Sequence, residues 1–491
     1  MAKSVKVNFV FNLFNNIGGI LFPLITFPYA SRILMADGIG QINFFISILS
    51  YISLFTCLGI PLYAIKEIAK VRDNKEEMSR TTIEILLLHT ALSFCGYFVV
   101  ALLCMTVAEI RVDIPLFLIL SLSIIFTALG CEWFYSGIEE FKYITIRNLL
   151  VKILYVILLF AFVRNKNDLH IYGILTILGT VGNNAFNFIY LRKFINIKPI
   201  SLSSLHICRH LRPSFKIFVL NLIISIYSNL DLVMLGFMKN VTIVGYYAAA
   251  TKIVSLFQGI SGSLRGVMLP RFSYLFQNGQ VDTFNQLAQR VMDFTLFISL
   301  PLTCGIVIMS PILIRIFCGE SFLPAITTLQ IISPILLAIS ISAIIGIQIL
   351  YPQNKEKIVI ISTAIGAITN LGLNIILIPY FGNDGAAIAT VVAETLVTIS
   401  MIIMGKMYIP LNLWSKHYQN CILGSAFILV VCYFVYRLAT PDIVALFLIP
   451  TMGGLVYLLF MYIVKDEFLK YMIATTKEKI YGKKNSIVHT T

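Results

Sequence analysis

Long apolar stretches, separated by short polar ones, recur from one end of the chain to the other. A helix needs about 20 mostly apolar residues to cross the hydrocarbon core of a bilayer. Helices are the expected form because every backbone polar group must be satisfied inside the bilayer. The stretches of spanning length are 8–31, 40–62, 82–106, 113–133, 146–163, 170–191, 216–238, 243–268, 291–316, 325–350, 358–379, 384–405, 417–436 and 443–464. The sequence therefore predicts an all-α integral membrane protein of about fourteen transmembrane helices.

The composition excludes a chain built from soluble domains. Hydrophobic residues make up 58% of the 491 residues and charged residues 12%, whereas ordinary globular domains carry about 25% charged residues. The net charge of +14 would suggest nucleic acid as the partner of a soluble protein. In a membrane protein the same excess is typical of cytoplasmic loops, so no nucleic-acid partner is expected.

The orientation follows from the positions of Lys and Arg. With the N-terminus inside, the predicted inner segments carry 27 of these residues and the outer loops carry 7. Basic residues concentrate on the cytoplasmic side of membrane proteins. We therefore expect a multi-pass protein with both termini in the cytoplasm.

Two related halves are predicted around the longest cytoplasmic connection. Gly38-Ile39-Gly40-Gln41-Ile42 and Val244-Gly245-Tyr246-Tyr247-Ala248 each open a helix after a tight outer turn. Two related helical lobes are a common plan among transporters, although any two amphiphilic hairpins also look alike. The expected parts are a six-helix lobe (1–195), a cytoplasmic linker (196–215), a second, pseudo-symmetric six-helix lobe (216–410), two C-terminal helices (411–465) and a basic cytoplasmic tail (466–491).

Motifs of soluble enzymes and of metal sites are missing. The sequence contains no GxxxxGK[ST], HExxH or GxSxG pattern. His206 and His210 lie four residues apart with Cys208 between them, but Arg209 and Arg212 would repel a cation. We interpret this segment as a basic connector at the membrane surface. Neither a metal nor a cofactor is expected, and a transporter is favoured over an enzyme.

Charged residues inside the predicted spans are the candidate functional residues, because such groups are costly in a bilayer and tend to line polar pathways. Asp231 and Lys252 flank the outer turn at equal sequence distance, so both lie about 16 Å from it on neighbouring helices. They neutralise one another as a structural ion pair or share a ligand. Arg265 lies about 20 Å deeper than Lys252 on the same helix.

Three further charged residues belong to the candidate set. Arg32 follows the first span, Lys66 closes the second on the inner side, and Glu394 lies near the middle of the twelfth. Arg32, Lys66, Lys252 and Arg265 together suggest a cavity for an anion, against the alternative that some of them only anchor helix ends. Asp231 and Glu394 are the candidates for ion pairing or for coupling to H⁺ or Na⁺.

Seven segments, in this order along the chain, resemble the Wzx-type flippases of bacterial polysaccharide synthesis, in the superfamily that also holds the MATE exporters. These segments are Pro28-Tyr29-Ala30-Ser31-Arg32-Ile33-Leu34, Gly59-Ile60-Pro61 running into Lys66-Glu67-Ile68-Ala69-Lys70-Val71-Arg72-Asp73, Glu132-Trp133-Phe134-Tyr135-Ser136-Gly137 with Glu139-Glu140-Phe141-Lys142-Tyr143, Leu230-Asp231-Leu232-Val233-Met234-Leu235-Gly236, Val244-Gly245-Tyr246-Tyr247, Leu269-Pro270-Arg271 and Gly382-Asn383-Asp384-Gly385-Ala386-Ala387. One departure is Met35, where the family more often has Gly.

The resemblance implies a flippase in the bacterial cytoplasmic (inner) membrane that moves oligosaccharide on polyprenyl pyrophosphate by alternating access. It implies that basic residues meet the pyrophosphate, that the last two helices shelter the lipid tail among membrane lipids, and that a polysaccharide polymerase is a partner. Two alternatives stay open, a MATE-type cation-coupled exporter and a flippase of lipid-linked peptidoglycan precursors. The absence of Asp and Glu from 7–36 and 40–62 speaks against the exporter.

Overall fold

The structure is a computed structural model of the chain. It describes residues 5–196, 205–412, 414–438 and 441–475, except for the side chains of residues 5–17, 20, 220–221, 223–228, 260–267 and 438. Within these residues every regular element is a helix, which confirms the predicted all-α fold class. By packing, the chain divides into two compact units, Met1–Ala248 and Ala249–Thr491.

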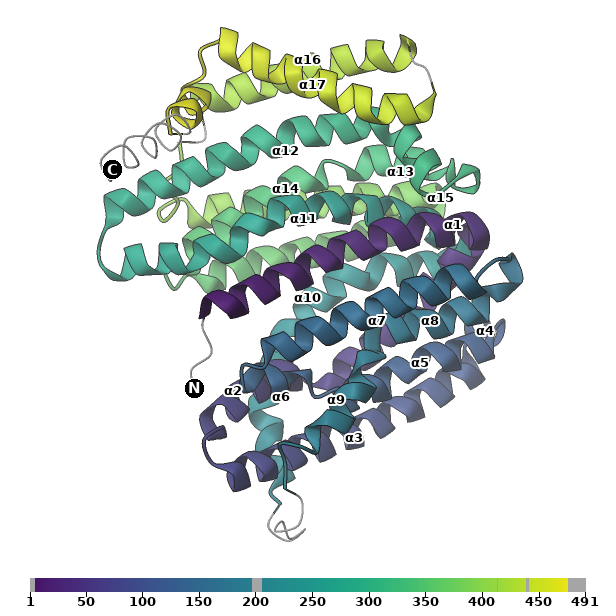
Figure 1. The fold of residues 1–491 in the computed structure, drawn as a ribbon. Helices are drawn as coiled ribbons and strands as arrows, with labels where there is room; N and C mark the ends of the chain where they lie inside the picture. The colour runs from purple at the N-terminus through teal and green to yellow at the C-terminus, as the bar shows by residue number, and fades with distance from the viewer. Residues whose placement is uncertain (1–4, 197–204, 413, 439–440, 476–491) are drawn as a thin grey trace, which may run out of the picture. The chain divides into compact units, whose positions relative to one another are not determined.

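Unit 1 is a bundle in which helices of spanning length run side by side (Figure 1). Its helices are α1 (Val5–Cys57), α2 (Ile60–Val71), α3 (Lys75–Thr106), α4 (Ala108–Arg111), α5 (Ile114–Leu129), α6 (Glu132–Gly137), α7 (Phe141–Phe162), η1 (Lys166–Asp168), α8 (Leu169–Val181), α9 (Asn183–Leu191), η3 (Ile207–His210), α10 (Leu211–Met238) and the first turns of α11 (Val241–Gln277). One of its cores gathers apolar side chains of α2, α3, α6 and α7, including Ile60, Ile85 and Phe134.

Unit 2 contains the rest of α11 and the remaining helices. These are α12 (Val281–Phe317), η4 (Glu320–Phe322), α13 (Ala325–Ile332), α14 (Ile335–Ala343), the π-helix η5 (Ile344–Leu350), α15 (Glu356–Gly405), α16 (Lys416–Leu438) and α17 (Asp442–Ile463). Its core joins α11, α12, η5 and α15 through residues such as Phe272, Phe284 and Met401. The boundary between the two compact units lies within α11, whereas the two predicted lobes meet at the linker 196–215. The predicted lobes concern halves that are related in sequence, and their boundaries stay predictions.

The two longest helices each break where the sequence predicts a turn. In α1 the break is at Met35, with φ 56° and ψ −174°; in α15 it is at Gly382, with φ 56° and ψ −126°. Glycine adopts positive φ at little cost because it has no Cβ. Met35 lacks this freedom, so the backbone there is strained. Each break divides one long helix into two of the predicted spans.

The described residues contain nine helices long and apolar enough to cross a membrane, or ten when the bent pair α8–α9 is taken as one span. Glu356–Gly405 holds the two predicted spans 358–379 and 384–405, and Leu21–Val71 holds the end of the span 8–31 and all of 40–62, joined in each case at a break. α10 and α11 cover the predicted spans 216–238 and 243–268. The predicted number of fourteen is therefore approximate.

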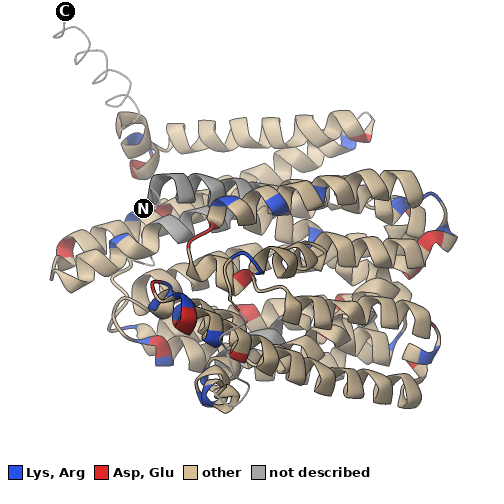
Figure 2. Cartoon of the chain, turned by 60° about the horizontal axis from the view of Figure 1, so that its bottom comes forward, with Lys and Arg blue, Asp and Glu red and all other residues tan. Residues whose placement is uncertain are grey.

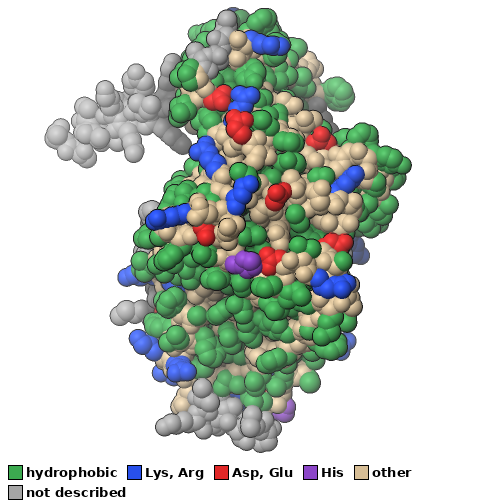
Figure 3. All heavy atoms as spheres, turned by 90° about the vertical axis from the view of Figure 1, so that its right-hand side faces the viewer, with side chains coloured by type: hydrophobic (Ala, Val, Ile, Leu, Met, Phe, Trp, Pro, Cys, Tyr) green, Lys and Arg blue, Asp and Glu red, His purple; other side chains and the backbone are tan. Residues whose placement is uncertain are grey.

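The surface suits a bilayer. Along the helices most residues are uncharged, and charged residues gather mainly at helix ends and connecting turns (Figure 2). On α3 the side chains of Phe94, Phe98 and Met105 are 67%, 75% and 75% exposed, which a lipid environment makes favourable. Figure 3 looks toward the helix ends and shows acidic and basic side chains among hydrophobic ones on that face.

The last two helices are fastened to α12 by a polar contact in unit 2. Asp466, just after α17, accepts hydrogen bonds from His417 Nδ1 and Asn420 Nδ2 of α16, both at 2.9 Å. His417 Nε2 lies 3.1 Å from the carbonyl oxygen of Asp293 on α12. Although burial acts to raise it, the hydrogen bonds from His417 and Asn420 hold the pKa of Asp466 below its usual range. The ionised carboxylate therefore fixes α16 and α17 against the bundle.

Candidate functional site

The two basic candidates of the first spans are exposed, Arg32 on α1 and Lys66 within α2. Arg32 lies on α1, three residues before the break at Met35. Lys66 lies on α2 one turn before Lys70, which pairs with Glu67 at 2.7 Å. The structure thus places Arg32 and Lys66 on different helices, with the break at Met35 and the rest of α1 between them. It does not bring them together.

The acidic candidate of unit 1 is buried and bonded. Asp231, on α10, has 6% of its surface exposed, and its carboxylate accepts a hydrogen bond from the hydroxyl of Tyr247 on α11. This hydrogen bond offsets part of the free-energy cost of burying a carboxylate inside a membrane helix. The sequence prediction paired Asp231 with Lys252 and did not identify Tyr247.

The basic candidates of unit 2 lie on α11. Lys252 is half-buried there, three residues before Ser255, whose hydroxyl bonds its carbonyl oxygen at 2.7 Å. Arg265 is also part of α11, but its side chain lies outside the described residues. The predicted pairing of Lys252 with Asp231 joins residues of the two units and stays a prediction.

Glu394 is buried in the second half of α15, with 7% of its surface exposed. The hydroxyl of Thr398 donates to the carbonyl oxygen of Glu394 at 3.0 Å and to that of Ala338, on α14, at 3.1 Å. A polar ladder of buried amides lies on the same long helix: Asn374 Nδ2 donates to Asn370 Oδ1 at 3.1 Å. Glu394 therefore belongs to a helix that carries several buried polar groups, as expected for a pathway or a specific helix contact.

A buried carboxylate that the sequence analysis did not select ties the linker to unit 1. Glu84, on α3, is fully buried. Its oxygens accept hydrogen bonds from the backbone N–H of His206 at 2.8 Å, from His210 Nε2 at 2.9 Å and from Arg209 at 2.7 Å. The segment interpreted as a basic connector thus holds His210 in the interior, where it is 2% exposed.

The protonation of His210 follows from its partners. Burial lowers the pKa of His210, and its hydrogen bond to Glu84 offsets this only in part. A neutral ring with the proton on Nε2 donates to Glu84, and Nδ1 then accepts from the Tyr63 hydroxyl at 2.8 Å. With a neutral imidazole, both ring nitrogens of His210 are therefore hydrogen-bonded, one to Tyr63 and one to Glu84.

Among the described residues, no group of three or more His, Cys, Asp or Glu side chains could hold a metal ion.

Arg147 is a second buried charge that sequence reasoning did not select. It lies on α7 with 6% of its side chain exposed, 3.5 Å from Glu132. Its guanidinium donates to Asn187 of α9 and, at 2.7 Å, to the adjacent Asn148. The signal available in the sequence was the group of asparagines in an otherwise apolar span, since such amides need partners inside a membrane.

An uncharged groove lies within unit 2 beside the last two helices. It encloses about 490 Å³. Its walls come from α11, α12, α16 and α17 and comprise Phe257, Phe297, Ile298, Pro301, Leu302, Gly305, Ile306, Met309, Leu313, Ile428, Cys432, Leu446, Ile449, Pro450, Gly453, Gly454, Tyr457 and Leu458. At Gly305 and Gly454 an added Cβ would meet nothing within 4 Å. The groove therefore has open space at these two positions and suits an apolar chain.

Comparisons with known proteins agree with this architecture. Residues 5–276 match the model of a family described as polysaccharide biosynthesis protein. A putative O-antigen transporter of Escherichia coli (strain K12) is 26% identical over 388 residues, which is 78% of this chain and 92% of the relative.

Two solved structures share the fold. Lipid II flippase MurJ in an inward closed conformation has a TM-score of 0.70 at 20% identity, covering 94% of this chain and 98% of that chain. An inward-facing MATE family multidrug resistance transporter of the MOP superfamily has a TM-score of 0.61 at 13% identity, covering 81% and 94%. At these identities the likeness concerns the fold alone.

Proposed function

Because the chain belongs to the polysaccharide biosynthesis protein family, as the resemblance in its sequence predicted, we propose that it is a flippase for oligosaccharide repeat units linked to polyprenyl pyrophosphate. The repeat unit moves from the cytoplasmic to the outer leaflet of the bacterial cytoplasmic membrane by alternating access and then enters surface polysaccharide. The Escherichia coli relative is a putative O-antigen transporter, which supports this substrate class.

The observation that carries the proposal is the uncharged groove of unit 2. A polyprenyl tail needs an apolar surface along its length, and the groove is lined by apolar side chains of α12, α16 and α17. The tail lies in this groove and in the surrounding lipid while the headgroup passes through the protein.

The headgroup is held by basic side chains. Arg and Lys are the natural partners of phosphate oxygens, and Lys252 and Arg265 lie on one helix, α11. Lys66 receives the pyrophosphate at the inner side and Arg32 meets it at the outer side.

In this proposal both termini of the chain lie in the cytoplasm. A polysaccharide polymerase takes over the exported repeat unit.

Two sources of energy fit the charges. An interior-negative membrane potential favours outward movement of an anion by about 2.3 kcal/mol per charge at 100 mV. Alternatively, Asp231 or Glu394 binds H⁺ or Na⁺ and couples its movement to the cycle. These two energy sources can be distinguished by measuring transport while the membrane potential, the proton gradient or the sodium gradient is dissipated, one at a time.

Filling the groove tests the proposal. Gly454→Leu adds a side chain into open space in the groove, and Gly372→Leu on α15 is the matched control because a Cβ there also meets nothing within 4 Å. We expect Gly454→Leu to abolish complementation of a deletion strain, with lipid-linked oligosaccharide accumulating, while Gly372→Leu restores surface polysaccharide. Full complementation by both variants at normal protein levels would remove the groove from the mechanism.

The two alternatives predict other phenotypes. A MATE-type exporter would change drug sensitivity on deletion and leave surface polysaccharide intact. A peptidoglycan-precursor flippase, the function named for the MurJ structure, would be essential even in a strain that makes no surface polysaccharide. We expect neither result.

A further inference from the structure

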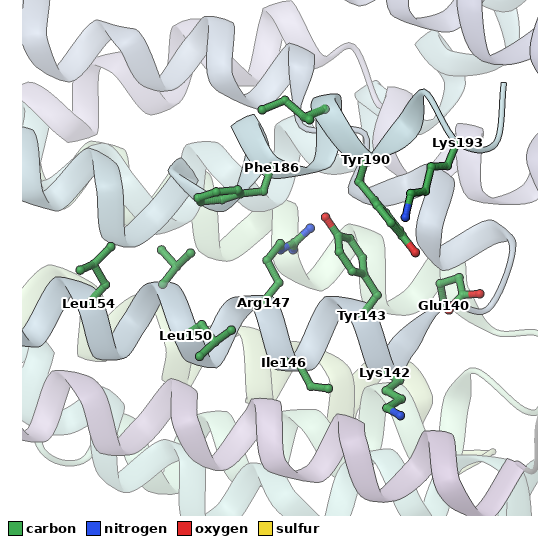
Figure 4. Close-up of a pocket in the computed structure, with 12 residues that line it drawn as sticks. Glu140, Lys142, Tyr143, Ile146, Arg147, Leu150, Leu154, Phe186, Tyr190 and Lys193 are labelled. Carbon is green, nitrogen blue, oxygen red and sulfur yellow. The ribbon is translucent and has the colours of Figure 1, made fainter. Parts of the chain in front are cut away.

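A second groove, in unit 1, has the features of a lipid-binding site. It encloses about 740 Å³ between α7 and α9. Figure 4 shows Tyr143 and Arg147 directed from α7 toward Tyr190 and Phe186 of α9. The lining residues are Glu140, Lys142, Tyr143, Ile146, Arg147, Leu150, Val151, Leu154, Phe186, Ile189, Tyr190 and Lys193. Neither the proposed transport path nor the groove of unit 2 uses these residues.

The groove is polar at one end and apolar at the other. The polar end carries the basic residues Lys142, Arg147 and Lys193 against one carboxylate, Glu140. The aromatic rings of Tyr143 and Tyr190 stack there with centroids 4.4 Å apart. Lys193 lies over the face of Tyr190, with its Nζ 5.0 Å from the centroid.

The apolar end has the length of a lipid chain in one leaflet. Along α7 the lining residues Leu150, Val151 and Leu154 follow the polar end toward the middle of the helix. From Tyr143 to Leu154 the helix rises about 16 Å at 1.5 Å per residue. Half of the hydrocarbon core of a bilayer is about 15 Å thick. A lipid with its headgroup at Tyr143 therefore lays its chains beside Leu150 and Leu154.

We propose that this groove binds one anionic glycerophospholipid of the cytoplasmic leaflet. The phosphate lies beside Lys193 and the Tyr190 hydroxyl. Lys142, which Figure 4 shows directed away from α9, adds its positive charge to the same end of the groove. Arg147 connects α7 to α9 through its hydrogen bond to Asn187. Its positive charge lies at the same end of the groove, and Glu132 is its acidic partner at 3.5 Å. Basic pockets between transmembrane helices on the cytoplasmic side recognise anionic headgroups in this way. The proposal does not depend on the flippase function.

Binding of defined lipids to the delipidated full-length chain tests the headgroup. We would titrate phosphatidylglycerol and phosphatidylcholine with the same acyl chains and measure occupancy by native mass spectrometry. We expect one molecule of phosphatidylglycerol to bind at least tenfold more tightly than phosphatidylcholine. Lys142→Gln with Lys193→Gln should weaken phosphatidylglycerol about 30-fold, since each basic residue near anionic lipid contributes about 1 kcal/mol.

The control for the charges is the double variant Lys70→Gln with Lys75→Gln. Both lysines are exposed in unit 1 and neither lines the groove. We expect this variant to bind phosphatidylglycerol as the unaltered chain does. Equal affinity for the two lipids, or an equal loss in both double variants, would overturn the proposal.

A second pair of variants tests the place of the acyl chains. Leu150 and Ile157 lie on α7 and are 61% and 59% exposed, but only Leu150 lines the groove. Leu150→Trp should lower phosphatidylglycerol occupancy at least fivefold, whereas Ile157→Trp should leave it unchanged. An effect of the same size from both would contradict the assigned groove. Stoichiometric displacement of phosphatidylglycerol by an equal concentration of a long-chain polyprenyl phosphate would instead assign the groove to the lipid carrier, and would also overturn the proposal.

Discussion

Removing the Glu84 carboxylate should release the linker from unit 1 at a large cost in stability. Glu84 is fully buried and is bonded to the backbone of His206 and to the side chains of Arg209 and His210. Breaking a buried, bonded charge network typically costs about 3–5 kcal/mol. The Arg209 side chain is 39% exposed and can turn to water, so its own share is at most about 1 kcal/mol.

We therefore expect Glu84→Ala to lower the free energy of unfolding by about 3 kcal/mol. A unit of this size shifts its melting temperature by roughly 2–4 °C per kcal/mol, so the midpoint should fall by roughly 6–12 °C. Glu84→Gln keeps the shape and an acceptor for the His206 amide, and should lose roughly half as much. The control is Glu77→Ala, because Glu77 is exposed in the first turn of α3 and contributes about 0.3–1 kcal/mol at most.

Thermal unfolding in detergent, with limited trypsin digestion at the linker, measures both effects. In the intact chain the bond to Glu84 should protect the peptide bond after Arg209, and Glu84→Ala should expose it. Equal melting temperatures for Glu84→Ala and Glu77→Ala, with unchanged digestion, would show that the network carries no stability and that the linker is held by other contacts.

Three further predictions concern Met35, Gly40 and the predicted pair of Asp231 and Lys252. Met35→Gly should stabilise the chain by about 1 kcal/mol, because strain of about 1–3 kcal/mol at positive φ outweighs the backbone freedom of glycine, about 0.5–1 kcal/mol; a lower melting temperature would contradict this. Gly40→Ala should destabilise unit 1 by about 1–3 kcal/mol, because its Cβ would lie 1.7 Å from the carbonyl oxygen of Val241, whereas Gly19→Ala, with open space around its Cβ, should have a melting temperature within a degree of the unaltered chain. Exchanging Asp231 and Lys252 should partly restore the polysaccharide lost in either single variant if the two form only a structural pair, and no rescue would favour a ligand or coupling role.

The sequence was sufficient to predict the helical class, because spanning length and low charge are local properties that the bilayer enforces. It also located the breaks. The turn expected after Arg32 lies at Met35, where α1 breaks with a positive φ. The second break, at Gly382, lies in the segment Gly382-Asn383-Asp384-Gly385. The structure adds that the chain continues as helix immediately after each break.

The buried polar contacts could not be predicted in the same way. Glu84 follows the polar residues 72–81 and looks like the solvated start of a helix; its partners are more than a hundred residues away in the sequence. Arg147 lies at the end of the predicted span 146–163, where a basic residue is expected to face the cytoplasm. Whether a charge at a helix end faces water or a neighbouring helix depends on packing between distant segments, which the local pattern does not contain.

The central claim is that basic residues of α11 hold a diphosphate while its sugar crosses the bilayer. The direct measurement is the rate at which a fluorescent oligosaccharide on polyprenyl pyrophosphate becomes accessible across proteoliposomes that contain the purified chain. We expect Lys252→Ala and Arg265→Ala to slow this rate at least tenfold, with Lys357→Ala, an exposed residue near the start of α15, as the control of unchanged rate. Equal rates in all four proteins, or a rate no higher than in protein-free liposomes, would contradict the account.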